Sequence, residues 1–161
     1  EVGADRLVNS LGAFVTYNNL SNKNTTIDSS NNKGILIVDS GTALTFCYIT
    51  KECVYKGGVI LPGLKLSSIA LTEYTAKIPL TYVSPTDELI GRSTKQAVEI
   101  GLYQGFIHMI NGFINQYKQF DPNLMVVGTG KGLEIMKDKL DLDAFDPLII
   151  HKGLAYCADN L

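Results

Sequence analysis

Two short segments near the start of the chain carry side chains that could move a proton and hold an anion. Asp5 and Arg6 directly follow Gly3 and Ala4, where the apolar pattern predicts the start of a helix. A carboxylate can accept a proton, and a guanidinium can hold a carboxylate through two parallel hydrogen bonds. Residues 3–6 therefore pair a candidate base with a candidate anchor. The simpler alternative is an acid that complements the helix dipole, beside a surface arginine.

The second segment follows the apolar run 35–38, which predicts a buried strand that delivers Asp39 to its end. The small residues after it, including Gly41 and Thr42, predict a turn. Its backbone N–H groups and hydroxyls suit phosphate oxygens, so we expect the turn to approach a phosphate. Asp39 could alternatively do no more than cap the turn.

Two further places could meet a nucleotide or another anion. Thr129 and Gly130 lie in a glycine-rich loop after an apolar strand, although such loops often only link a strand to a helix. Thr94 and Ser93 compete for the N-cap of the long predicted helix. A cap and a substrate contact are compatible there, because helix N-termini favour anions.

The hydrophobic periodicity predicts one α/β domain over residues 1–161, built on a mixed sheet. A mobile loop is predicted over about 18–33, which is rich in Asn and Ser. The third predicted strand ends at Gly57 and Gly58. The predicted helices are 4–17, 63–76, 92–118, 131–140 and a last one from Gly153, and the predicted strands are 34–39, 43–50, 53–56, 124–127 and 148–150.

Composition narrows the class of protein. A net charge of −2 argues against a nucleic-acid-binding surface, and no apolar run approaches the ~20 residues that span a bilayer. No secretory signal pattern is present, so we expect a cytoplasmic protein. Cys47, Cys53 and Cys157 show no metal-ligand spacing and predict free thiols. A disulfide between Cys47 and Cys53 across a hairpin is the alternative.

Four motifs, in this order and spacing, make the chain resemble the C-terminal two-thirds of a type III pantothenate kinase, a member of the acetate kinase/sugar kinase/Hsp70/actin superfamily. They are Gly3 to Arg6, Asp39 to Ala43, Gly57 to Gly63 and Ile90 to Thr94. The resemblance implies a ribonuclease H-like mixed sheet flanked by helices, the second lobe of an actin-like ATPase fold whose first lobe is missing here. The implied activity is phosphorylation of pantothenate by ATP to 4′-phosphopantothenate, the first step of coenzyme A biosynthesis.

The resemblance also implies residue roles. Residues 3–6 are implied to bind pantothenate, with Asp5 as the general base for its hydroxyl. Thr94 is implied to reach pantothenate from the partner subunit of a homodimer. Asp39 is implied to bind a monovalent cation, K⁺ or NH₄⁺, and Mg²⁺ accompanies ATP. The ATP contacts implied are Gly41, Thr42, Thr129 and Gly130.

The chain departs from the family pattern in three ways. The family begins with roughly 90 to 100 further residues, an extra lobe that holds the first phosphate loop. The family usually has an aspartate where Cys47 stands, and a second glycine where Lys131 stands. These departures leave two alternatives to the kinase: a non-catalytic regulatory relative, similar to the Bvg accessory factors, or one subunit of a split kinase.

Overall fold

The computed structural model describes residues 2–18 and 31–160. Over these residues the chain forms five strands, five α-helices and one short 3₁₀ turn, η1. In chain order the elements are α1 (Ala4–Tyr17), β1 (Ile35–Ser40), β2 (Ala43–Ile49), β3 (Tyr55–Pro62), α2 (Leu64–Glu73), α3 (Thr94–Phe120), β4 (Met125–Thr129), α4 (Lys131–Glu134), η1 (Lys137–Lys139), β5 (Ala144–Phe145) and α5 (Ile149–Asn160).

The strands form one mixed sheet in the order β3-β2-β1-β4-β5. β1 pairs antiparallel with β2, which pairs antiparallel with β3. On its other edge β1 pairs in parallel with β4, so that Asp39 lies opposite Thr129. The predicted α/β class with a mixed sheet is therefore confirmed. The loops that follow β1 and β4 lie at the same end of the sheet, because the carboxyl ends of parallel strands are on the same side.

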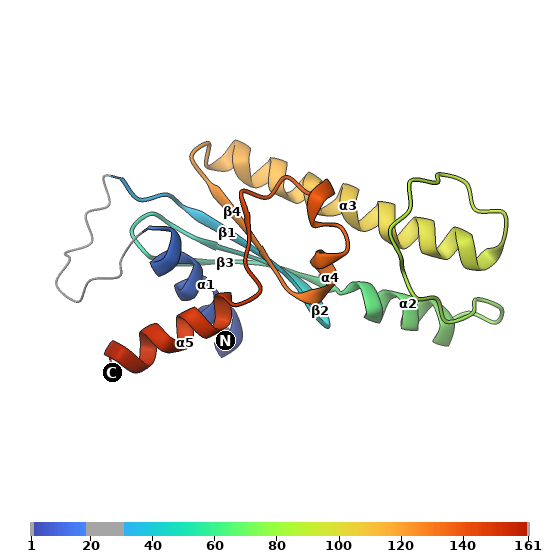
Figure 1. Ribbon diagram of the computed structural model, residues 1–161, viewed down its shortest axis with the longest axis horizontal. Coiled ribbons are helices and arrows are strands. Elements are labelled where there is room, and N and C mark those ends of the chain that lie inside the picture. Colours follow the sequence, from blue (N-terminus) through green and yellow to red (C-terminus); the bar gives the residue numbers. More distant parts are fainter. Residues whose placement is uncertain (1, 19–30, 161) are drawn as a thin grey trace.

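Helices cover both faces of the sheet. Side chains alternate along a strand, so Leu36 and Val38 of β1 pack toward α3, whereas Ile35 and Ile37 pack toward α1. In Figure 1, α3 runs along one side of the sheet, and α1 lies with α5 on the other. β1 is buried on both faces, as its uninterrupted apolar run requires.

Two glycines allow α1 and α5 to cross closely. A Cβ built on Gly12 would lie 2.2 Å from the carbonyl oxygen of Ile149, and one built on Gly153 would lie 2.2 Å from that of Val8. Side chains larger than hydrogen would push the helices apart. This contact fixes α1 against the sheet and thereby fixes the position of its first turn.

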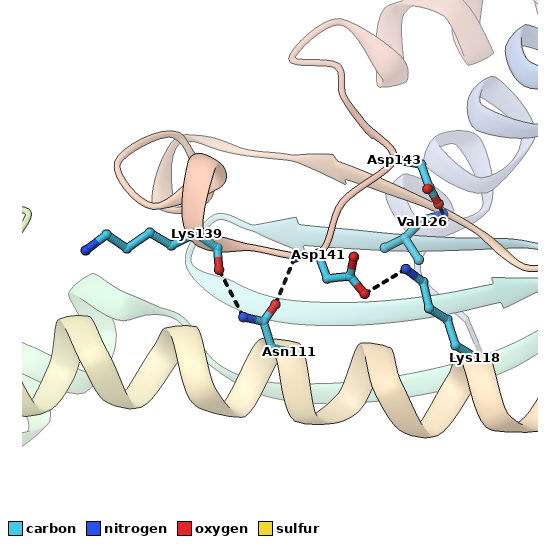
Figure 2. Close-up of polar contacts among 6 residues, drawn as sticks. All are labelled: Asn111, Lys118, Val126, Lys139, Asp141 and Asp143. Carbon is cyan, nitrogen blue, oxygen red and sulfur yellow. Dashed lines mark hydrogen bonds and ion pairs between the residues drawn. The ribbon is translucent and has the colours of Figure 1, made fainter.

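On the opposite face, polar contacts join α3 to the segment between β4 and β5. Asn111 donates to the carbonyl of Lys139 at 3.0 Å and accepts from the N–H of Asp141 at 2.9 Å. Lys118 pairs with the carboxylate of Asp141 at 2.7 Å, and Asp143 accepts from the N–H of Val126 at 2.8 Å (Figure 2). These contacts are local to this face and lie apart from α1.

The structure corrects three predicted elements. β3 continues through Gly57 and Gly58 to Pro62 instead of ending there. The predicted helix over 131–140 is only the single turn of α4 followed by η1. The predicted strand at 148–150 is the loop end and first turn of α5, and the short strand β5 lies earlier.

Two further expectations concern loops and membranes. Most of the predicted loop over 18–33 falls on residues 19–30, outside the described residues; its two ends are joined, since Asn18 accepts from the N–H of Lys33 at 2.9 Å. Over the described ranges, no helix combines the length and the apolar character needed to cross a bilayer.

Candidate active site

The first turn of α1 presents Asp5 to solvent. Gly3 precedes the helix and accepts from the N–H of Arg6 at 3.2 Å, which begins the helix without a side-chain cap. The Asp5 carboxylate turns back over Gly3: a Cβ at position 3 would lie 2.5 Å from its Oδ1. Glycine at position 3 therefore leaves the space that this carboxylate occupies.

Arg6 points toward the sheet and contacts Cys47. The Nε–H of Arg6 donates to Cys47 Sγ at 3.2 Å, and the Tyr55 hydroxyl donates to the same sulfur at 3.5 Å. Cys47 faces α1 because it lies one residue after Phe46, which packs on the opposite face. The bond to Cys47 raises the pKa of Arg6, and burial together with its own bond to Cys47 raises the pKa of Tyr55 to about 12. The three cysteines are free thiols, so the alternative disulfide does not form.

Asp39 lies near the end of β1 and is held by Asn9 of α1. Asn9 Nδ2 donates to Asp39 Oδ2 at 2.9 Å. Burial raises the pKa of Asp39, the bond from Asn9 opposes this, and the negative charge of Asp5 raises it further. The Asp5 carboxylate therefore lies within electrostatic reach of Asp39. Within the described part of the chain, no lysine or arginine forms an ion pair with Asp39.

Two other loops contact the turn after Asp39. Gly130 has a φ of +89°, and a Cβ there would lie 2.5 Å from Asp39 Oδ1. Gly63, just before α2, donates its N–H to the carbonyl of Thr42 at 2.9 Å. A Cβ at Gly63 would lie 2.4 Å from the carbonyl oxygen of Gly41. Glycine is needed at both positions because the backbones approach so closely.

Beside this turn lies a cleft of about 630 Å³. Its walls combine the turn, the apolar side of α2 and the start of α4; they are Ser40, Gly41, Thr42, Leu64, Lys65, Leu66, Ile69, Lys131, Gly132 and Ile135. The size is that of a small-molecule site. Apolar side chains on one wall and the two lysines, Lys65 and Lys131, suit a ligand that has both a flat apolar part and phosphates.

The structure brings most of the predicted site residues together, with one exception. Gly3, Ala4, Asp5 and Arg6 begin α1, Asp39 joins them through Asn9, and Gly41, Thr42, Thr129 and Gly130 border the neighbouring turn or cleft. Thr94 lies elsewhere: the start of α3 and the start of α1 are far apart in Figure 1, on opposite sides of the sheet. Ser93, not Thr94, caps α3, since its side chain accepts from the N–H of Gln96 at 3.3 Å.

Sequence reasoning missed Asn9, which is buried and bonded to Asp39. The available signal was its spacing of four residues from Asp5, which places both side chains on one face of a helix. It also missed the contact of Gly63 with the turn, for which no local signal exists.

The residues around Asp39 fit a monovalent cation. They offer a carboxylate that no basic side chain of the described ranges pairs with, beside an amide oxygen, Asn9 Oδ1, that accepts from no described group.

Comparison with known proteins places the chain in a family. A family model described as type III pantothenate kinase matches residues 1–116. Type III pantothenate kinases of Listeria welshimeri and Bacillus cytotoxicus are 35% and 32% identical over 156 and 157 residues, 96% of this chain. The chain spans about half the length of these curated relatives, 55% and 54%.

A solved structure shares the fold. It is that of a Campylobacter jejuni protein assigned to the Baf family of transcriptional activators, with a TM-score of 0.55 and 20% identity. The similarity covers 94% of this chain and 73% of that one. Because the family match extends over well more than half of the residues, the chain belongs to the type III pantothenate kinase family.

Proposed function

We propose that the complete gene product transfers the γ-phosphoryl group of ATP to pantothenate, giving 4′-phosphopantothenate in the first step of coenzyme A biosynthesis. It does so in the cytoplasm. The observation that carries the proposal is the contact that joins the helix of the first motif to the second motif: Asn9, one turn after Asp5, donates to Asp39 at 2.9 Å. A candidate base and a candidate phosphate turn therefore meet, which phosphoryl transfer requires of its two substrates.

The start of α1 serves pantothenate. Asp5 accepts the proton of the attacking hydroxyl, which its exposed position at the helix start permits. Arg6 binds the pantothenate carboxylate. Its Nε–H is already occupied by Cys47, so the two terminal amino groups remain for the substrate. Gly3 and Ala4 complete this segment and allow the substrate to approach the backbone.

The cleft beside the turn serves ATP and the Mg²⁺ that accompanies it. Thr42 offers its hydroxyl to the phosphates, and Gly41, without a side chain, lets them approach the backbone; both residues line the cleft. Thr129 and Gly130 lie beside them at the end of β4. Lys131 lines the same cleft and is positioned to contact a phosphate, so we do not expect it to block the nucleotide.

Asp39 holds the activating monovalent cation, K⁺ or NH₄⁺, which supplies positive charge next to the phosphates. The whole chain then forms one domain, a ribonuclease H-like sheet that is the second lobe of an actin-like ATPase fold. The strand order β3-β2-β1-β4-β5, with an antiparallel first half and a parallel second half, supports this assignment.

Thr94 contributes to the pantothenate site of a second subunit in a homodimer. Its position on the far side of the sheet from Asp5 supports a role across an interface and not within one chain. The segment that leads to Thr94 exposes large apolar side chains, as a contact surface between subunits would. These are Tyr74, Leu80, Tyr82, Leu89 and Ile90.

The test is a coupled assay of ADP release with pantothenate and ATP on the complete gene product. Asp5→Asn should lower kcat by about two to four orders of magnitude while pantothenate still binds in calorimetry, because a general base contributes about that much. Asp159→Asn, the same change at an exposed position of α5, should turn over as the wild type does. Near-wild-type kcat in Asp5→Asn would eliminate Asp5 as the base. No turnover in the wild type would favour the regulatory alternative.

A further inference from the structure

Asn9 is a buried polar residue whose hydrogen bonding is half complete. It is 7% exposed and lies on the side of α1 that faces the sheet. Its Nδ2 donates to Asp39, but its Oδ1 is buried and has no hydrogen-bond partner within the described residues. An unsatisfied buried acceptor is destabilising, so a native protein rarely keeps one without a ligand or a water.

Asn111 shows how this chain otherwise satisfies such an amide. Its Nδ2 donates to the carbonyl of Lys139, and its Oδ1 accepts from the N–H of Asp141 (Figure 2). At Asn9 the orientation of the amide is fixed, because only Nδ2 can donate to a carboxylate. Turning the amide over would place two oxygens against each other. The unpartnered oxygen is therefore a feature of the site.

Negative charge lies beside Asn9 Oδ1. Asp39 is bound to the same amide and carries a carboxylate that no basic side chain of residues 2–18 and 31–160 pairs with. Asp5 adds a second negative charge nearby. Arg6, three residues before Asn9 in the same helix, directs its Nε–H to Cys47. A hard cation, which prefers carboxylate and amide oxygens, satisfies both the charge and the orphan acceptor.

We propose that Asn9 Oδ1 and the Asp39 carboxylate are joint ligands of one monovalent cation, which thereby ties α1 to the end of β1. This inference rests on the proposed function, in which Asp39 binds the cation, and it adds a ligand from the substrate helix. Asn9 and Asp5 lie four residues apart on one helix face. The bound cation therefore also fixes the position of the candidate base relative to the turn after Asp39. Cation binding then stabilises the folded protein, independently of turnover.

The experiment measures thermal unfolding of the complete gene product in KCl and in tetramethylammonium chloride at equal concentration. Tetramethylammonium keeps the ionic strength but is too large to share the two oxygens. The wild type should show a higher Tm in KCl. Asn9→Leu, of similar volume, should lose this difference or need about tenfold more KCl to reach it, and Asp39→Asn should lose it. Asn111→Leu removes a fully bonded asparagine on the other face; it should lower Tm yet keep the difference.

Asn9→Asp keeps an oxygen at the proposed ligand position and removes the donor to Asp39. It should show a larger KCl-dependent rise than the wild type, since K⁺ would then separate two carboxylates. This variant decides the question if Asn9→Leu does not fold. A rise that persists in Asn9→Leu but disappears in Asp39→Asn would overturn the role of Asn9, leave the cation at Asp39 and indicate a water at Oδ1. No rise in the wild type would overturn both cation assignments, while the kinase assay would still test Asp5.

Discussion

Gly130 provides a test of how the β4–α4 loop packs against the turn after Asp39. Its φ of +89° is one that L-residues with a side chain rarely adopt. A Cβ there would lie 2.5 Å from Asp39 Oδ1 and 2.6 Å from the backbone oxygen of Ser40. The carboxylate could shift, but the backbone of β1 is held in the middle of the sheet and could not. Gly130→Ala therefore combines an unfavourable backbone conformation with a steric overlap.

The two costs can be estimated separately. Left-handed backbone at a residue with a Cβ costs about 1–2 kcal/mol, and overpacking of a buried contact costs about 1–3 kcal/mol. We expect Gly130→Ala to lower the free energy of unfolding by about 3 kcal/mol. With a urea m-value of about 2 kcal/mol/M, the unfolding midpoint should fall by about 1.5 M.

Gly41→Ala, in the turn that Gly130 approaches, is the matched control. Its φ is not in the left-handed region, and nothing lies within 4 Å of the Cβ that the change would add. Urea unfolding of this variant should stay within about 0.5 kcal/mol of the wild type. If Gly130→Ala were as stable as Gly41→Ala, the close approach of the β4–α4 loop to Asp39 would be wrong. The proposed cation site would then not border the cleft.

Three further predictions concern the site and its surroundings. Cys47→Ala removes the acceptor that holds Arg6 and should raise the KM for pantothenate about tenfold with little change in kcat, whereas Cys47→Ser should stay close to the wild type in the same assay. Burial and a hydrogen bond raise the pKa of Tyr48 to about 12, so its contribution to stability should be complete below pH ~10 and fall from there toward pH 12; urea unfolding of Tyr48→Phe should lack this fall. If Thr94 acts across a dimer, mixing Asp5→Asn with Thr94→Val should restore part of the activity, and equally inactive mixtures would refute a shared site.

The sequence predicted those parts of the fold that depend on local pattern. The predictions of a buried strand before Asp39 and of a helix after Gly3 are confirmed. A continuous apolar strand and an amphipathic helix can each be recognised from a short stretch of sequence. The glycines of β3 misled the prediction. At Gly58 a Cβ would lie 1.7 Å from the carbonyl oxygen of Phe46, so glycine marks a close approach of paired strands and not a strand end.

Two other misses have a non-local cause. Leu148 to Ile150 form an apolar run that is too short to distinguish a strand from a helix, and the packing of Ile149 against α1 decides for the helix. Asn9 reads as an ordinary polar residue in a helix until the fold places Asp39, thirty positions away in the chain, against it. The base and the turn were predictable as separate motifs, but the residue that joins them was not.

Cys47, the departure that first suggested an inactive relative, is compatible with catalysis once its contact is known. Arg6 keeps a hydrogen-bond acceptor in the thiol, so its orientation does not depend on a carboxylate. Asp5 and Asp39 contribute −2 and Arg6 contributes +1, a formal sum of −1 for these side chains, and an aspartate at position 47 would make it −2. Cys47 adds no carboxylate to this group, so in the proposed function one monovalent cation balances its formal charge. In the proposed function, no carboxylate at position 47 competes with that of pantothenate for the terminal amino groups of Arg6.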